Sequence, residues 1–202
     1  MRKTGERAHL LPRAFLFPGK SMKTRDMAYI SIFAALIALC AWLSVPAAIP
    51  FTMQTFAVFA VGGTLGARRG AAALGLYILL GALGLPVFSG FQGGAGALLG
   101  ATGGYILGFL PAAFIAGLGA ERFGRSLPAL ILSMCAGLLA CYALGTAWYV
   151  AVYARAGEAA SVTAVLSACV LPFIPADAAK IFLAATLSKR LAPFCAPEHR
   201  RG

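Results

Sequence analysis

Charged residues are scarce in this chain of 202 residues. Asp, Glu, Lys and Arg together make up 11% of it, whereas hydrophobic residues make up 60%. The mean hydropathy is +0.85. This balance excludes a soluble globular domain, because the surface of such a domain carries far more charge. The sequence therefore predicts an integral membrane protein.

The apolar stretches also lack the groups that common enzyme chemistry requires. The two histidines, His9 and His199, lie in charged segments near the chain ends, which argues against a histidine-based metal site or catalytic triad within the membrane. The five cysteines show no metal-binding spacing, and we expect no disulfide among them. No Walker sequence is present, so we do not expect this chain to hydrolyse ATP. We predict no enzyme activity, no cofactor and no metal.

Long uncharged stretches are what the sequence does contain, and they are residues 27–67, 70–120, 126–154 and 159–176. A helix that spans a membrane needs about 20 apolar residues, so the first two stretches each hold two helices and the third holds one. The residues after Pro175 supply one more. We therefore predict an all-α fold with six transmembrane helices, in one membrane domain over residues 22–192.

The basic residues are distributed unevenly between these helices. Seven Lys or Arg precede the first helix, two follow the second, two follow the fourth and four follow the sixth, whereas the other connections hold one at most. Cytoplasmic segments of membrane proteins are enriched in Lys and Arg. We therefore expect a multi-pass protein of the cytoplasmic membrane, surrounded by lipid, with both termini cytoplasmic. The net charge of +11 then reflects topology, and no nucleic-acid partner is expected.

The two ends of the chain are basic segments outside the predicted helices. Residues 1–21 are interrupted by Pro12, Pro18 and Gly19, and we do not expect them to form a signal peptide. They are either a disordered arm drawn to anionic lipid or sequence upstream of a start at Met22, the interpretation we favour. Residues 193–202 are expected to form a short cytoplasmic tail.

Asp177 and Lys180 are charges within the otherwise apolar segment LPFIPADAAK (171–180). Prolines suit the first turn of a helix, so a helix is predicted to begin near Pro175. Residues three apart share one face of a helix. Ionisable groups at membrane depth commonly mark a substrate or ion pathway, and the alternative is a salt bridge that only holds the helix to its neighbours.

Glycine is dense between the third and fourth predicted helices, with ten residues from Gly81 to Gly108. Glycine permits close backbone approach, and non-helical backbone at membrane depth is tolerated where it is buried in protein or lines a cavity. We therefore expect the segment GFQGGAGALLGATGGY (90–105) to form an outward-facing wall or lid over a site.

Three smaller features each have two interpretations. Gln54, near the outer end of the second helix, either caps that helix or contacts a ligand. Trp148 and Tyr149 either belong to an aromatic belt at the membrane surface, or one of them lines a ligand pocket. Ala34 and Ala38 allow a helix to approach the first helix closely, and that helix belongs either to this chain or to a partner.

Two long segments, GLPVFSGFQGGAGALLGATGGY (84–105) and LPFIPADAAK (171–180), resemble the BioY family of biotin transporters. Members of this family are the substrate-binding S components of energy-coupling factor (ECF) transporters. PFTMQTF (50–56) and GARRGA (66–71) are similar to the family as well, and the resemblance covers roughly residues 22–192. It implies high-affinity binding and uptake of biotin, with a transmembrane coupling subunit (the T component) and ATPase subunits as partners. An S component for another vitamin, or a membrane protein without a transport role, is the alternative.

The resemblance also implies which residues form the site. They are Asp177, Lys180, Gln92, Gly93, Gly94 and Tyr105, with Gln92 at a position where Asn is common in the family. The small pair Ala34 and Ala38 is similar to residues that dock the T component. Asp177 can accept a hydrogen bond from a ureido N–H of biotin, and Lys180 can donate to the ureido oxygen or pair with the carboxylate.

Overall fold

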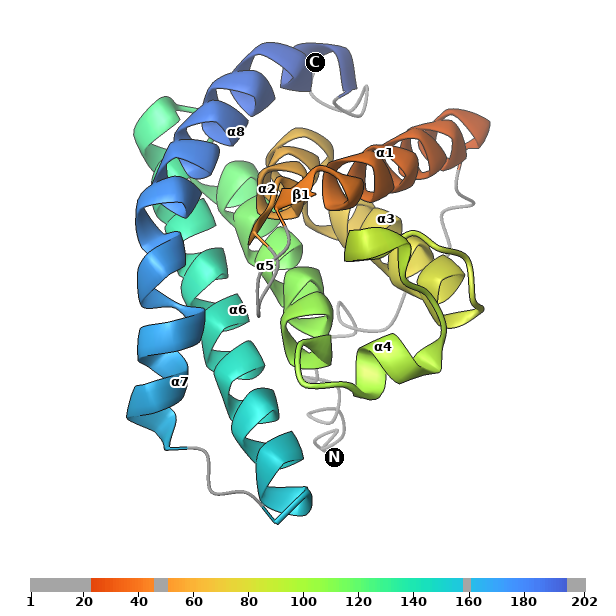
Figure 1. The fold of residues 1–202 in the computed structure, drawn as a ribbon. Helices are drawn as coiled ribbons and strands as arrows, with labels where there is room; N and C mark the ends of the chain where they lie inside the picture. The colour runs from red at the N-terminus through yellow and green to blue at the C-terminus, as the bar shows by residue number, and fades with distance from the viewer. Residues whose placement is uncertain (1–22, 46–50, 158–160, 196–202) are drawn as a thin grey trace, which may run out of the picture.

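The computed structural model describes residues 23–45, 51–157 and 161–195. Within them the chain is almost entirely helical (Figure 1), with α1 (Thr24–Trp42), α2 (Gln54–Leu65), α3 (Ala67–Ala82), α4 (Ala95–Leu99), α5 (Gly103–Arg122), α6 (Leu127–Arg155), α7 (Val162–Cys169) and α8 (Ile174–Cys195). The remaining elements are two 3₁₀ turns, η1 (Ser89–Phe91) and η2 (Leu171–Phe173), and two short strands, β1 (Ser44–Val45) and β2 (Phe51–Thr52). The predicted extension at residues 1–21, and residues 196–202 of the predicted tail, lie outside the described residues.

The lengths of the helices divide them into two groups. Four stretches of the described residues are long and apolar enough to cross a membrane, and they are Thr24–Trp42, Gly103–Arg122, Leu127–Arg155 and Val162–Cys195. The chain is therefore an all-α membrane protein, as the composition predicted. α2 and α3 are shorter than the length we expected, with 12 and 16 residues. At 1.5 Å per residue, α2 extends about 18 Å, less than the roughly 30 Å of a hydrocarbon core.

α2 is short because the chain turns at both of its ends. β1 and β2 pair antiparallel with Ser44 opposite Thr52, so the chain turns back soon after α1 ends at Trp42. At the other end, Gly66 has a φ of +85°, a backbone conformation that stops the helix and favours glycine. Nearly all residues of α2 are buried, as expected for a helix that is apolar on every side.

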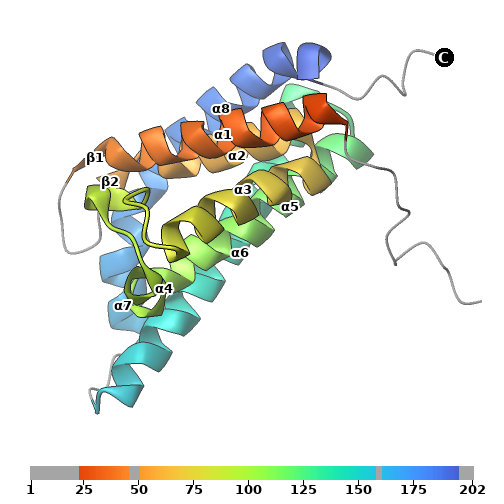
Figure 2. The same cartoon turned by 90° about the vertical axis from the view of Figure 1, so that its right-hand side faces the viewer.

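The helices pack around α2, which lies against both α5 and α8. α5 packs along α6 and, on another side, against α3, whereas α1 packs on α3 and α2 (Figure 2). A glycine brings α5 and α6 close together, since a Cβ atom at Gly137 would lie 2.6 Å from the carbonyl oxygen of Ala112. This arrangement encloses a space between α2, α5, α6 and α8.

The predicted Gly-rich loop, between α3 and α5, is anchored to the helices beside it. The indole Nε1 of Trp42 donates a hydrogen bond to the carbonyl oxygen of Pro86 over 2.8 Å. The hydroxyl of Tyr77 donates to the carbonyl oxygen of Val87 over 3.2 Å. The start of this segment is therefore held against α1 and α3.

Charged side chains gather at one end of the bundle, which we call the charged end (Asp26, Arg69 and Glu121). The Glu121 carboxylate accepts a hydrogen bond from the backbone N–H of Ala67 over 3.0 Å, where it caps the N-terminus of α3. Arg69 pairs with Asp26 over 3.2 Å and donates to the carbonyl oxygen of Cys195 over 3.1 Å. Arg69 thus joins α3 to both α1 and α8.

Candidate binding site

Asp177 and Lys180 lie at the start of α8, which begins at Ile174, one residue before the predicted start. Asp177 is in the first turn, where the partial positive charge of a helix N-terminus favours a carboxylate. The Lys180 ammonium donates to Asp177 Oδ1 over 2.8 Å. The two residues are 3% and 4% exposed. They share one face of the helix, as their spacing predicted, and they form a buried ion pair.

Tyr142 on α6 completes this polar cluster. Its hydroxyl donates to Asp177 Oδ2 over 2.6 Å, a length typical of an O–H bond to a carboxylate. Asp177 therefore has one donor on each carboxylate oxygen, one from its own helix and one from α6. Tyr142 was not predicted from the sequence. The feature of the sequence that could have indicated Tyr142 is its position inside an uncharged stretch, since a buried phenol generally has a hydrogen-bond partner.

Aromatic rings cover the Lys180 ammonium. Lys180 Nζ lies 4.1 Å from the ring centroid of Phe51 in β2, within the range of a cation–π interaction. The Phe51 ring stacks on Phe173 of η2, with centroids 5.9 Å apart. The strand hairpin and the turn before α8 thus meet above the ion pair, and neither ring was predicted as part of the site.

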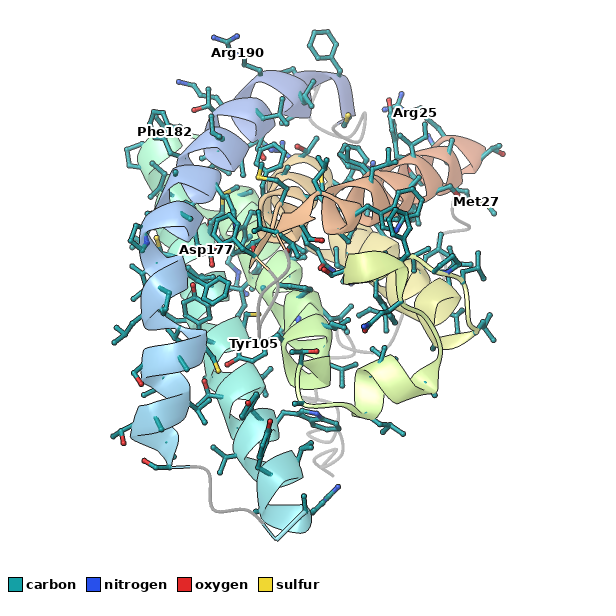
Figure 3. All side chains as sticks on the ribbon, in the orientation of Figure 1. Arg25, Met27, Tyr105, Asp177, Phe182 and Arg190 are labelled. Atoms are coloured by element: carbon teal, nitrogen blue, oxygen red, sulfur yellow. The ribbon has the colours of Figure 1, made fainter. Side chains whose placement is uncertain are left out.

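A cavity of about 80 Å³ lies beside this cluster, between α5, α6 and α8 (Figure 3, where Asp177 and Tyr105 are labelled). Its polar lining comprises Asp177, Lys180, Tyr142, Tyr105, Thr52 and Thr55, and the rest is apolar or thiol. Pockets that bind small molecules commonly measure about 300–1,000 Å³. A ligand of vitamin size therefore requires some lining side chains to move apart.

Two further residues predicted for the site lie in different places. Tyr105 lines the cavity, and its hydroxyl is 3.4 Å from Thr146 Oγ1. Gln54 is buried at the start of α2, where its side-chain amide donates to the hydroxyl of Tyr77 over 2.9 Å. Gln54 is not among the described residues that line the cavity. Its amide connects α2 to α3 through Tyr77, which in turn holds the Gly-rich segment.

The predicted residues of the Gly-rich segment contact the end of α3 and the turn that follows it. The carbonyl oxygen of Gln92 accepts from the N–H of Phe88 over 2.9 Å, and the N–H of Gly94 donates to the carbonyl oxygen of Gly81 over 2.7 Å. A Cβ atom at Gly93 would collide with the carbonyl of Leu85. None of Gln92, Gly93 and Gly94 is among the described residues that line the cavity.

Trp148 on α6 contacts the far end of the same segment. Its indole Nε1 donates to the carbonyl oxygen of Gly100 over 3.0 Å. Its side chain also lies against Gly104, where a Cβ atom would overlap the indole. Trp148 therefore anchors the segment before α5, and it too is outside the set of described residues that line the cavity.

Ala34 and Ala38 line a groove between α1 and α3 with a volume of about 440 Å³. Trp42 and Tyr77, which hold the Gly-rich segment, line its far end. Apart from Ser31 and the polar atoms of Trp42 and Tyr77, the lining is apolar. Ala34 and Ala38 are themselves buried in the core of the chain, at 3% and 7% exposed. Their small size leaves space beside them for another apolar segment.

Comparison with known proteins extends the resemblance over most of the chain. Residues 16–196 match the model of the BioY family. The chain is 40% identical to "Biotin transporter BioY" of Thermotoga maritima over 168 residues, which cover 83% of this chain and 95% of that protein. It is 39% identical to "Probable biotin transporter BioY" of Pyrococcus horikoshii over 171 residues, which cover 84% of this chain and 98% of that protein.

The fold is also similar to a solved structure, the crystal structure of the "S-component for biotin from an ECF-type ABC transporter". The TM-score is 0.76 at 24% sequence identity, over 85% of this chain and 92% of that chain. At this identity the likeness shows a shared fold. With the family match and the relatives that it resembles over nearly their full length, the chain belongs to the BioY family.

Proposed function

We propose that this chain binds biotin with high affinity outside the cell and carries it across the cytoplasmic membrane as the S component of an ECF transporter. Its relatives are named biotin transporters. The observation that carries the proposal is the buried Asp177–Lys180 pair beside a cavity. A charged pair at membrane depth provides hydrogen-bonding groups that an apolar pocket otherwise lacks.

The ureido group of biotin suits this pair better than its carboxylate does. Asp177 and Lys180 neutralise each other across 2.8 Å, so the cluster carries no net charge. A ureido N–H can donate to a remaining lone pair of Asp177, and the ureido oxygen can accept from Lys180. A ligand carboxylate would add an uncompensated negative charge to a buried site, which is costly. We therefore assign the ureido group to Asp177 and Lys180.

Binding requires the cavity to open, because its volume is about 80 Å³. Phe51 and Phe173 are the side chains that we propose to move, since they come from a two-residue strand and a 3₁₀ turn instead of a long helix. Their displacement uncovers the Lys180 ammonium from one side. A ligand then reaches the ion pair without any change in the packing of α5 against α6.

Among the other predicted residues, we propose that one contacts the ligand directly and that the rest support the walls of the site. Tyr105 lines the cavity and contacts the apolar rings of biotin. Gln54 and Trp148 act indirectly, because each holds part of the wall by the hydrogen bonds described above. Gln92, Gly93 and Gly94 keep the Gly-rich segment folded against α3.

The proposed topology places the charged end in the cytoplasm, as the positive-inside rule requires. Six helices, α1, α2, α3, α5, α6 and α8, then cross the membrane within the domain 22–192, and both termini are cytoplasmic. The Gly-rich segment between α3 and α5 faces outward. α2 is too short to span alone, and its burial among neighbouring helices shields it from lipid.

A coupling subunit and ATPase subunits are the proposed partners, because we expect no ATP hydrolysis by this chain. We propose that a helix of the T component enters the groove between α1 and α3, against Ala34 and Ala38. The small side chains there permit close contact between helices. Membrane lipid surrounds the remaining apolar surface.

Binding of radiolabelled biotin to the purified protein tests this function, with riboflavin and thiamine as competitors. We expect saturable binding that unlabelled biotin displaces and the other two vitamins do not. Displacement by riboflavin or thiamine at similar concentrations would instead indicate a carrier for that vitamin. A purified, folded protein that binds none of the three would contradict a role as a vitamin carrier.

A further inference from the structure

Tyr142 and Asp177 form the connection between α6 and α8 at the cavity. Among the described residues, Tyr142 is the one side chain outside α8 that hydrogen-bonds to Asp177. The other donor, Lys180, is on the same helix as Asp177, one turn away. Tyr142 is therefore the group that fixes the carboxylate relative to the opposite wall of the cavity.

The hydrogen bond from Tyr142 limits how Asp177 can meet a ligand. An ionised carboxylate is an acceptor with about four lone-pair sites on its two oxygens. Lys180 occupies a site on Oδ1 and Tyr142 occupies a site on Oδ2. A ligand N–H can therefore approach only the lone-pair sites of the carboxylate that Lys180 and Tyr142 leave unoccupied. Without Tyr142, the carboxylate can turn about its own side chain while it still pairs with Lys180.

We propose that Tyr142 is a positioning residue for ligand binding, which orients the Asp177 carboxylate so that Oδ2 meets a ligand N–H. This inference rests on the proposed function, because it takes the ligand group at Asp177 to be an N–H donor. Tyr142 lines the same cavity as Asp177, but it acts through the carboxylate. Its loss therefore has no effect on affinity once Asp177 can no longer accept that N–H.

A binding assay with Tyr142→Phe tests the proposal, because this change keeps the ring and removes only the hydroxyl. We expect biotin affinity to fall by roughly tenfold to a hundredfold, because an Asp177 carboxylate that is no longer oriented loses its hydrogen bond to the ligand N–H. Tyr153→Phe is the matched control. Tyr153 is on the same helix and stacks on Tyr149 with centroids 4.6 Å apart, away from the cavity. Its affinity should stay within about twofold of the unmodified protein, and a loss below about threefold in Tyr142→Phe overturns the proposal.

The decisive measurement is the effect of Tyr142→Phe in an Asp177→Ala background, where residue 177 has no side-chain acceptor. There we expect Tyr142→Phe to alter biotin affinity by less than about threefold, because the carboxylate it orients is gone. An equal loss in both backgrounds would mean that Tyr142 supports the fold and does not act through Asp177, which overturns the proposal. The thermal unfolding midpoint of each variant shows that it is folded.

Changes in the ligand provide a second double-mutant cycle if biotin binding to Asp177→Ala is too weak to measure. Biotin analogues methylated at one or the other ureido nitrogen each lack one N–H. If Tyr142 positions Asp177 for one N–H, the effect of Tyr142→Phe disappears for one analogue and persists for the other. The same fold-loss with both analogues overturns the proposal. If the unmodified protein does not bind biotin, the proposed function itself has failed, and the two failures are distinct.

Discussion

Lys180 and Asp177 form an ion pair one turn apart on α8, with Nζ 2.8 Å from Oδ1 and almost no exposure to solvent. Removing two charges from water costs several kcal/mol per ion, and their attraction repays this only with good geometry and further hydrogen bonds. A buried ion pair therefore contributes little net stability to a fold. Its position beside a cavity is better explained by ligand binding.

Topology can be tested with single cysteines at Gly96 in α4 and at Phe123 between α5 and α6. Both positions are exposed, and a Cβ atom at Gly96 meets nothing within 4 Å. In a background without the five native cysteines, Gly96→Cys should react with a membrane-impermeant maleimide in intact cells, and Phe123→Cys should react only after lysis. The reverse pattern would contradict cytoplasmic termini, and the cysteine-free protein is the control.

The site could be predicted from the sequence where local spacing decides it. Two charges three residues apart, after two prolines, predict a helix start and a shared face, and the structure has both. Tyr142 and Phe51 could not be found in this way. They reach the pair from α6 and β2, and a uniformly apolar helix has no periodicity to indicate which side faces inward.

The fold, like the site, could be predicted from the sequence only where local features determine it. Composition and the length rule predict membrane helices, but they assume that each one must cross the hydrocarbon core alone. α2 has 12 residues and is enclosed by its neighbours, and only tertiary packing can determine this. The glycine density predicted an outward-facing wall or lid over a site, which stays a prediction. The anchoring of this loop by Trp42 and Trp148 depends on residues distant in sequence.

The groove between α1 and α3 gives a prediction about docking. Replacing Ala38 with Leu should weaken complex formation with the coupling subunit by about 1–3 kcal/mol, because extra bulk occupies the groove. Biotin binding should be retained, since the ligand cavity lies between α5, α6 and α8. Co-purification of the T component and biotin binding are the two measurements.

Ile32→Phe is the matched control for docking, because Ile32 is on the same helix and 63% exposed. It should leave both measurements unchanged. Complex formation that survives both Ala38→Leu and Ala34→Leu would contradict docking in this groove. The small pair would then serve only the packing of α1 on α3.

The basic extension gives a prediction that concerns residues 1–21. If Met22 is the working start, deletion of these residues should leave biotin uptake and protein abundance within about twofold of normal, since only surface electrostatics of about 1 kcal/mol per basic residue are lost. Uptake by cells and quantification of the membrane-embedded protein provide the comparison. A large loss of uptake at normal abundance would assign a function to the extension.

The most direct test of the central claim is biotin titration of Asp177→Asn, Lys180→Met and the double variant, at matched abundance of folded protein. If both residues contact biotin, each single change should weaken binding by about 1.5–3 kcal/mol, or roughly tenfold to a few hundredfold, and the double variant should bind no better than either. If the two residues only pair with each other, removing both charges relieves the uncompensated charge that each single change leaves. Binding restored to the unmodified level in the double variant would contradict the ligand role of Asp177 and Lys180.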